Sequence, residues 1–189
     1  MTYALIAIGG SLGSFKVLQV ILAALPPTFK VPVVIIVHRE RGQEAILAPL
    51  VQSHCALPVA EIEDKGRIEP GRIYIAPSDY HVLVEDGTFA LSVEAPLHHA
   101  RPSIDITFES MADYYGRRAI GVILTGTGQD GAQGMAALRQ RGGQTVVQTP
   151  ASAEAPGMPE AAISAGAAGH VLPPEEIGPF LVKLTEERP

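Results

Sequence analysis

A serine lies between two glycines directly after the first apolar run of the chain, in the order Gly9-x-Ser11-x-Gly13. This spacing is typical of a sharp turn between a strand and a helix that exposes a catalytic serine. A serine hydroxyl becomes a useful nucleophile only when a base removes its proton, and the base works best when a third group fixes its tautomer. The turn alone leaves open whether it presents a nucleophile or binds a phosphate group.

Two further polar residues follow apolar runs elsewhere in the chain. His38 directly follows the run Val33–Val37. Asp130 lies in the glycine-rich segment after the run Ala119–Leu124. Because functional residues of parallel α/β sheets gather at the carboxyl ends of the strands, we expect Ser11, His38 and Asp130 to meet at one sheet edge. They would act there as nucleophile, base and orienting acid, in a chain order that differs from that of the α/β-hydrolases.

Each of these three residues also has a purely structural interpretation. Ser11 could cap the helix that starts after Gly13, and Asp130 could cap the helix that starts at Gly131. His38 could be a half-buried histidine at the end of a strand. The presence of all three at one expected edge favours catalysis over three separate explanations.

The elements that must position these residues alternate between strands and helices. Continuous apolar runs predict strands buried on both faces, and amphipathic runs between them predict helices. We therefore expect a three-layer α/β/α sandwich on a doubly wound, mostly parallel sheet, with an antiparallel hairpin at about residues 72–93 on one edge. Strands are predicted at Tyr3–Ile8, Val33–Val37, Arg72–Ala76, Val82–Val84, Thr88–Val93, Ala119–Leu124 and Gln144–Gln148, and helices at Phe15–Leu25, Glu44–Gln52, Ile104–Tyr115, Gly131–Gln140, Pro159–Ala165 and from Pro174 to before Arg188.

The entrance of the expected helix Ile104–Tyr115 carries several polar side chains. Ser103 is predicted to cap this helix, and Asp105 lies in the first turn, where the helix dipole favours a carboxylate. Arg101 precedes Pro102 and Ser103. Arg101 is either an ordinary solvated charge or a residue that faces the substrate.

Composition limits the classes of protein to consider. The chain has 189 residues, 47% of them hydrophobic, and we expect a single domain over residues 1–189. The net charge of −6 and the lack of basic runs argue against nucleic acid as a partner, and no segment is long and apolar enough to insert in a membrane. The only cysteine, Cys55, excludes an internal disulfide, and no signal peptide is visible, so a cytoplasmic location is expected.

The remaining histidines do not suggest a metal centre. His81, His98 and His99 lack the spacing of a helical metal-binding pair, and no cysteine cluster accompanies them. We therefore expect neither a metal nor another cofactor.

The chain contains four notable motifs, which are Gly9-Gly-Ser-Leu-Gly-Ser14, Arg101-Pro-Ser-Ile-Asp105, Leu124-Thr-Gly-Thr-Gly-Gln-Asp-Gly-Ala132 and Gly157-Met-Pro-Glu160. Together these motifs resemble the catalytic domain of the chemotaxis protein-glutamate methylesterases. The resemblance extends from about Ile6 to Ala165 and implies the same three-layer fold. It also implies hydrolysis of γ-glutamyl methyl esters on a chemoreceptor or a related signalling protein, with release of methanol and, often, deamidation of glutamines.

The resemblance assigns roles to individual residues. Ser11, His38 and Asp130 match the family's catalytic triad. The backbone N–H of Thr127 matches a group that holds the oxyanion, and the N–H of Leu12 is expected to assist it. Leu12 itself is a departure, because the family usually has threonine there. A second departure is that we expect no phosphoacceptor receiver domain, since the first strand begins almost at once after the start of this sequence.

Two alternatives remain open. The chain could be a catalytically weakened member of this family that only docks partners. It could also be a non-enzymatic module that binds an anion or nucleotide at the N-terminus of its first helix, with Glu40 as the acid of such a site.

Overall fold

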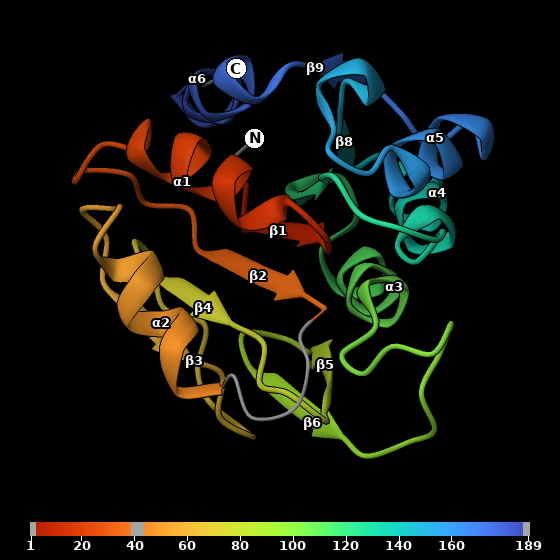
Figure 1. Cartoon of the computed structure of the whole chain (residues 1–189). Coiled ribbons are helices and arrows are strands. Elements are labelled where there is room, and N and C mark those ends of the chain that lie inside the picture. The colour runs from red at the N-terminus through yellow and green to blue at the C-terminus, as the bar shows by residue number, and fades with distance from the viewer. Residues whose placement is uncertain (1–2, 39–43, 187–189) are drawn as a thin grey trace.

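A parallel sheet of seven strands forms the centre of the molecule (Figure 1). The computed structural model describes residues 3–38 and 44–186. The strand order is β3-β4-β2-β1-β7-β8-β9, and every neighbouring pair is parallel. The strands are β1 (Leu5–Gly10), β2 (Val33–Val37), β3 (Val59–Glu61), β4 (Ile73–Ile75), β7 (Ala119–Ile123), β8 (Gln144–Gln148) and β9 (His170–Leu172).

Helices cover both faces of this sheet. Along β1, Leu5 and Ala7 belong to one apolar cluster and Ile6 and Ile8 to another, because successive strand residues point to opposite faces. The first cluster includes buried residues of α3, α4 and α5, and the second includes residues of α1, α2 and α6. The expected three-layer α/β/α sandwich is thus confirmed. The helices are α1 (Ser14–Ala23), α2 (Glu44–Gln52), α3 (Ile104–Tyr115), α4 (Ala132–Gln140), α5 (Gly157–Ser164) and α6 (Pro174–Glu186).

The strand order reverses direction beside β1. The first part of the chain builds the sheet from β1 towards β3, and the later part builds it from β7 towards β9. In doubly wound sheets, the crevice at the carboxyl ends of the strands on either side of such a switch is where ligands bind. The residues after β1 and β7 therefore occupy the functional position of this fold.

The region of residues 72–93 differs from the expected edge hairpin. Its first strand, β4, pairs with β2 and β3 inside the parallel sheet. Only β5 (His81–Val84) and β6 (Phe89–Ser92) form the antiparallel hairpin, which is a separate two-stranded sheet. The sequence analysis also missed β3 and β9, because strands of three residues are too short to show a period-two pattern.

No helix in the described ranges, 3–38 and 44–186, is long and apolar enough to cross a membrane.

Candidate active site

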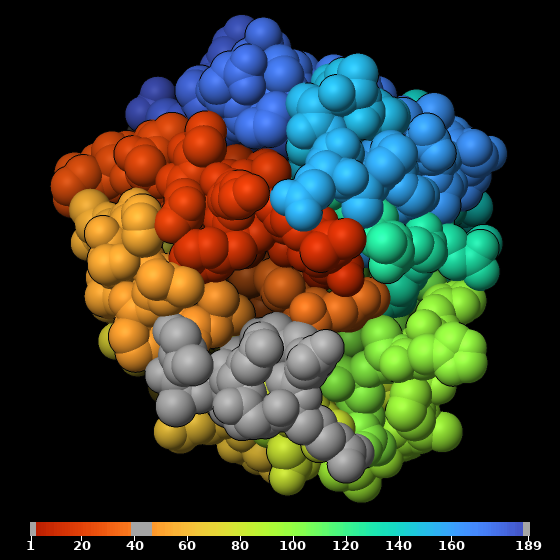
Figure 2. All heavy atoms as spheres, viewed as in Figure 1, coloured from red at the N-terminus to blue at the C-terminus, as the bar shows by residue number. Residues whose placement is uncertain are grey.

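Three chain segments meet at the carboxyl ends of the central strands. Ser11 follows β1 and His38 follows β2, and Gly10 lies opposite Val37 in the register between these strands. The His38 N–H donates to the Gly10 carbonyl at 3.2 Å, and the Ser11 N–H donates to the Thr125 carbonyl at 3.0 Å. The register and these two backbone bonds bring the ends of β1, β2 and β7 together, as expected. Figure 2 shows the surface over this edge, where the red, orange and blue-green segments adjoin.

The buried carboxylate of Asp130 pairs with the imidazole of His38. Asp130 Oδ2 lies 2.7 Å from His38 Nε2, and the two side chains are 3% and 21% exposed. The same carboxylate accepts hydrogen bonds from the Ser103 hydroxyl at 2.8 Å and from the N–H groups of Ile104 at 2.8 Å and Asp105 at 3.0 Å. Asp130 is therefore held by the first residues of α3, a helix from a different part of the chain.

This environment keeps Asp130 ionised. Burial is the largest single influence and by itself would raise the pKa of Asp130. The hydrogen bonds from His38, Ile104 and Asp105 and the attraction of the imidazole together outweigh it, so the pKa lies below its ordinary value. An ionised carboxylate at a helix N-terminus is also favoured by the helix dipole.

The pairing selects one tautomer of His38. An ionised carboxylate can only accept a hydrogen bond, so Nε2 of His38 carries the proton that points to Asp130. In the neutral ring, Nδ1 is then the basic nitrogen. Within residues 3–38 and 44–186, neither this Nδ1 nor the Ser11 hydroxyl forms a hydrogen bond. Both are available for a reaction.

The capping explanations for Ser11 and Asp130 are wrong. The N-cap of α1 is Gly13, with φ 79°, and the Ser14 hydroxyl donates to the Ser11 carbonyl at 2.6 Å. The N-cap of α4 is Gly131, with φ 93° and no side-chain cap. Both helices therefore begin at glycines whose left-handed conformation suits a tight turn, which leaves the two polar side chains unused for capping.

Gly126 lets the segment after β7 approach the serine. A Cβ atom at position 126 would lie 2.8 Å from Ser11 Cβ and would also meet Met158 Sδ. Because real Cβ atoms do not approach so closely, only glycine fits between Ser11 and α5.

Two backbone N–H groups in the segments after β1 and β7 have no partner among the described residues. In the part of the chain that the structure describes, the amides of Leu12 and Thr127 donate no hydrogen bond. The Leu12 carbonyl accepts a hydrogen bond from the Thr125 hydroxyl at 3.0 Å, which ties the peptide between Leu12 and Gly13 to the segment after β7. The Leu12 side chain is 55% exposed and points away from the core.

A cavity of about 720 Å³ opens beside the imidazole. His38, Asp130 and Thr127 line one side of it. The other side consists mainly of residues from the segment 93–101, which we call the cavity loop. The cavity is large enough for a side chain of a protein substrate. The remaining lining residues are Asp79, Pro96, His98, His99, Ala100, Arg101, Pro102, Gly128 and Gln129.

Arg101 lines this cavity, but its guanidinium is also engaged within the protein. Nη1 donates to the carbonyls of Val93 at 2.9 Å and Glu94 at 3.0 Å. Nη2 lies 3.8 Å from Asp79 Oδ1, and the Arg101 side chain is 20% exposed. Arg101 therefore holds the two ends of the cavity loop together, and its expected contact with substrate stays a prediction.

Ser103 is the functional residue that the sequence analysis missed. It occupies the N-cap position of α3 as expected, but its hydroxyl makes no cap and instead contacts Asp130. Its place within the Arg101–Asp105 motif was the available signal.

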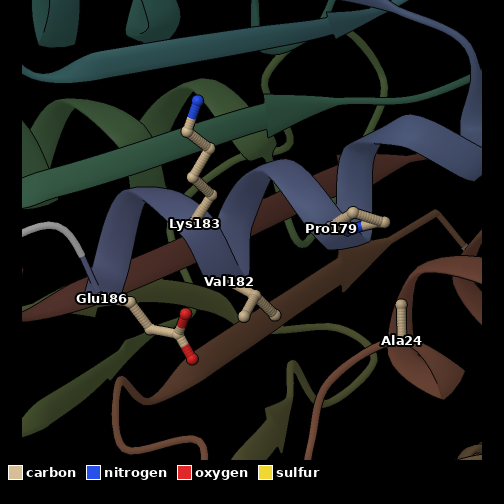
Figure 3. Close-up of a pocket in the computed structure, with 5 residues that line it drawn as sticks. All are labelled: Ala24, Pro179, Val182, Lys183 and Glu186. Carbon is tan, nitrogen blue, oxygen red and sulfur yellow. The ribbon is translucent and has the colours of Figure 1, made fainter.

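Within the described residues, neither a metal-binding cluster nor the hollow between α1 and α6 competes with this site. Within residues 3–38 and 44–186, no group of three or more His, Cys, Asp or Glu side chains could hold a metal ion. A hollow of about 500 Å³ lies between α1 and α6. Figure 3 shows its lining, in which Val182 extends from α6 towards the side of Ala24 while Lys183 points away. None of the expected site residues lies there.

Comparison with known proteins places this geometry in a family. Residues 6–181 match the family model described as CheB methylesterase. The chain belongs to the CheB methylesterase family. The resemblance inferred from the sequence motifs is therefore confirmed, and with it the enzyme class of the methylesterases.

Individual relatives agree with this assignment. A protein from Leptospira interrogans, provisionally named protein-glutamate methylesterase/protein-glutamine glutaminase, is 38% identical over 187 residues, which are 98% of this chain and 97% of that protein. Protein-glutamate methylesterase FrzG of Myxococcus xanthus is 41% identical over 185 residues, which are 97% of this chain and 55% of FrzG. This chain thus spans nearly all of the first relative and about half of the second.

A solved structure of the family has the same fold. The crystal structure of the Thermotoga maritima CheB methylesterase catalytic domain superposes with a TM-score of 0.92 at 33% identity. The match covers 97% of this chain and 100% of the Thermotoga chain.

Proposed function

We propose that this protein hydrolyses γ-glutamyl methyl esters of a chemoreceptor or a related signalling protein, with Ser11 as the nucleophile. The observation that carries the proposal is the hydrogen-bonded pair of His38 and the ionised Asp130, 2.7 Å apart at the strand ends next to Ser11. The substrate class follows from the names of the relatives, which are protein-glutamate methylesterases.

The first step forms an acyl-enzyme. Nδ1 of His38 takes the proton of the Ser11 hydroxyl while Oγ attacks the ester carbonyl carbon. Asp130 keeps the imidazole in the required tautomer and stabilises its positive charge. The C–O bond to the methoxy group then breaks, and His38 returns the proton to that oxygen, so that methanol leaves. Catalytic hydrogen bonds often tighten only when substrate is bound, so the Ser11–His38 contact is expected in that complex.

The second step regenerates the serine. A water molecule gives one proton to His38 and attacks the acyl carbon. The bond to Ser11 Oγ breaks, the serine recovers its proton from His38, and a glutamate side chain is released. A glutamine substrate follows the same two steps with ammonia as the leaving group, which is the glutaminase reaction in the names of several relatives.

The oxyanion of both steps is assigned to the free amides of Leu12 and Thr127. An amide that has no other partner can donate to a developing negative charge without first breaking a hydrogen bond. Removal of one such donor in other serine hydrolases lowers kcat by roughly 10²–10³.

The wider setting of the enzyme is part of the same proposal. We treat residues 1–189 as one catalytic domain, and we assign it a methylated receptor as partner. The cytoplasmic location and the absence of a cofactor that the sequence suggested stay predictions.

The test is covalent labelling combined with turnover. A fluorophosphonate probe should label the protein and should fail to label Ser11→Ala. The same variant should release no methanol from a peptide that carries a γ-glutamyl methyl ester. Labelling without methanol release would favour another ester as substrate. No labelling at all would favour the docking or anion-binding alternatives. Glu40, the acid of the anion-binding alternative, lies outside the described residues.

A further inference from the structure

A fully buried histidine lies behind the Asp130 carboxylate. His81 is the first residue of β5 and is 0% exposed. Its Nδ1 accepts a hydrogen bond from the Ser103 N–H at 3.1 Å, and its Nε2 lies 3.1 Å from the Ala95 carbonyl. The Ser103 hydroxyl in turn donates to Asp130 at 2.8 Å. A continuous series of hydrogen bonds therefore runs from Ala95 through His81 and Ser103 to the carboxylate.

The two neighbours of His81 determine its tautomer. The amide N–H of Ser103 can only donate, so Nδ1 of His81 must accept and carries no proton. The carbonyl of Ala95 can only accept, so Nε2 carries the proton and donates it. No aliphatic side chain could satisfy either buried group. The histidine is therefore required for its two nitrogen atoms and not only for its volume.

The far end of this series belongs to the cavity loop. Ala95 lies next to Pro96, which lines the cavity beside His38. Arg101 closes the same loop through the carbonyls of Val93 and Glu94. A substrate that enters the cavity would contact a loop that is tied, through His81, to the first turn of α3.

Other hydrogen bonds hold β5 on α3 independently of His81. The Thr107 hydroxyl donates to the Val82 carbonyl at 2.8 Å, and the Val84 N–H donates to the Ser110 hydroxyl at 3.0 Å. Residues 103, 107 and 110 lie on one face of the helix because of its 3.6-residue period. Replacement of His81 would remove one of three such contacts, so the hairpin should stay docked.

We propose that His81 is a positioning residue for the catalytic triad. Through Ser103 it sets the place of the hydroxyl that holds Asp130, and through Ala95 it couples the cavity loop to that carboxylate. The inference rests on the proposed function, in which Asp130 orients the imidazole of His38.

Two substitutions separate the two nitrogen atoms. In His81→Asn, the amide oxygen takes the place of Nδ1 and can still accept from Ser103, whereas the bond to Ala95 is lost. In His81→Gln, the amide nitrogen takes the place of Nε2 and can still donate to Ala95, whereas the acceptor for Ser103 is lost. The two variants thus test the carboxylate side and the loop side of the same residue.

The variants should affect different kinetic constants for the γ-glutamyl methyl ester peptide. We expect His81→Gln to lower kcat by about 10–100-fold with little change in KM, because a small displacement of a catalytic group has effects of this size. We expect His81→Asn to keep kcat within about threefold and to raise KM several-fold, since only the cavity loop is released. Ser103→Ala should lower kcat as His81→Gln does, and the double variant should be little worse than either single one.

A proton spectrum provides a readout that does not need turnover. The Nε2–H resonance of His38, in the downfield region of the proton NMR spectrum, reports the hydrogen bond of this group to Asp130. It should shift in His81→Gln and Ser103→Ala and stay in place in His81→Asn. If the wild-type protein released no methanol, the proposed function would fail, while this resonance would still decide the role of His81.

The control is His54→Asn, a histidine just after α2 that is hydrogen-bonded to Gln19 of α1, on the other face of the sheet from α3. It should leave kcat, KM and the resonance unchanged. Equal effects of His81→Asn and His81→Gln, or a loss of thermal stability with unchanged kinetics and spectrum in both, would reduce His81 to a structural residue and overturn the proposal.

Discussion

Two aspartates share the N-terminus of α3, and their surroundings differ in hydrogen bonds more than in burial. Asp130 is 3% exposed and Asp105 is 1% exposed. The Asp130 carboxylate accepts from His38, from Ser103 and from two backbone amides. The Asp105 carboxylate accepts from the Gly134 N–H at 2.7 Å, and its Oδ2, 3.4 Å from His98 Nε2, has no hydrogen bond within the described ranges.

The two pKa values consequently move in opposite directions. Burial is the largest influence on Asp105 and raises its pKa to about 6, with the charge of Asp130 acting in the same sense and the bond to Gly134 opposing it. For Asp130, the donors outweigh burial and lower the pKa. The comparison teaches that hydrogen-bond donors decide whether the pKa of a buried carboxylate is lowered or raised. Of the two, Asp130 is the carboxylate that holds the imidazole of His38, at 2.7 Å.

The largest expected effect separates the two residues by activity. Asp130→Asn should lower kcat by roughly 10⁴, because an amide no longer selects the proper tautomer of His38. Asp105→Asn should lower kcat by less than about tenfold, since the carboxylate of Asp105 does not pair with the imidazole of His38. The measurement is methanol release, with circular dichroism to show that both variants are folded. Comparable losses in both variants would mean that Asp105 also belongs to the catalytic machinery.

A second effect separates them by the pH dependence of stability. The folded-state pKa of Asp105, about 6, lies above its ordinary value of 3.8, so the folded protein binds an extra proton between these values. The contribution of Asp105 to the free energy of unfolding should therefore fall as pH rises through this window. The free energy of unfolding of Asp105→Asn, minus that of the wild type, should therefore be higher at about pH 7 than at about pH 4, by on the order of 2–3 kcal/mol.

Asp130 should show the reverse dependence. Because its folded-state pKa is lowered, its ionised form adds stability above the unfolded pKa, and this stability is lost as pH falls through the folded pKa. Asp130→Asn should therefore lower the free energy of unfolding most at neutral pH and less in acid. Urea unfolding of both variants at a series of pH values measures the two slopes. Slopes of the same sign would contradict the comparison.

A smaller effect concerns the ion pair of Asp105. His98 belongs to the cavity loop, and its electrostatic attraction lowers the pKa of Asp105. His98→Gln should therefore raise the pKa of Asp105 further, by less than about one unit. Titration of the Asp105 carboxyl carbon by NMR measures it. His99→Gln, a change in the adjacent residue of the same loop, is the matched control and should leave the titration in place.

The smallest effect is expected away from both carboxylates. Leu12 contributes the amide that follows Ser11 in the chain, and its side chain is exposed. Leu12→Thr adds a hydroxyl beside the nucleophile and should raise the turnover of a methyl ester by about two- to fivefold, well below the roughly 10²–10³ of a full oxyanion donor. A fall in turnover would indicate that Leu12 is adapted to a different acyl group.

Much of the fold could be predicted because its signals are local. The apolar runs of β1, β2 and β7 are continuous, and the helices α2 and α3 have the bounds that the sequence suggested. The place of β4 could not be predicted. A strand of three residues can join either a hairpin or a parallel sheet, and its partners, β2 and β3, lie elsewhere in the chain.

The sequence by itself determined which residues stand at the ends of the central strands. Ser11, His38 and Asp130 each follow an apolar run, and parallel strands bring their carboxyl ends to one edge whatever the rest of the chain does. Family membership followed from the same local motifs.

Only the tertiary structure decided what each of these side chains contacts. The sequence spacing suggested that Asp130 caps the helix that follows it. In the structure, its carboxylate instead accepts hydrogen bonds from the Ser103 hydroxyl and from two backbone amides of α3. The sequence spacing likewise left His81 without a role, although the fold buries it between Ala95 and Ser103. The physical reason is that a buried polar group must find its partner among whatever atoms packing brings near, and those atoms come from segments that are distant in the chain.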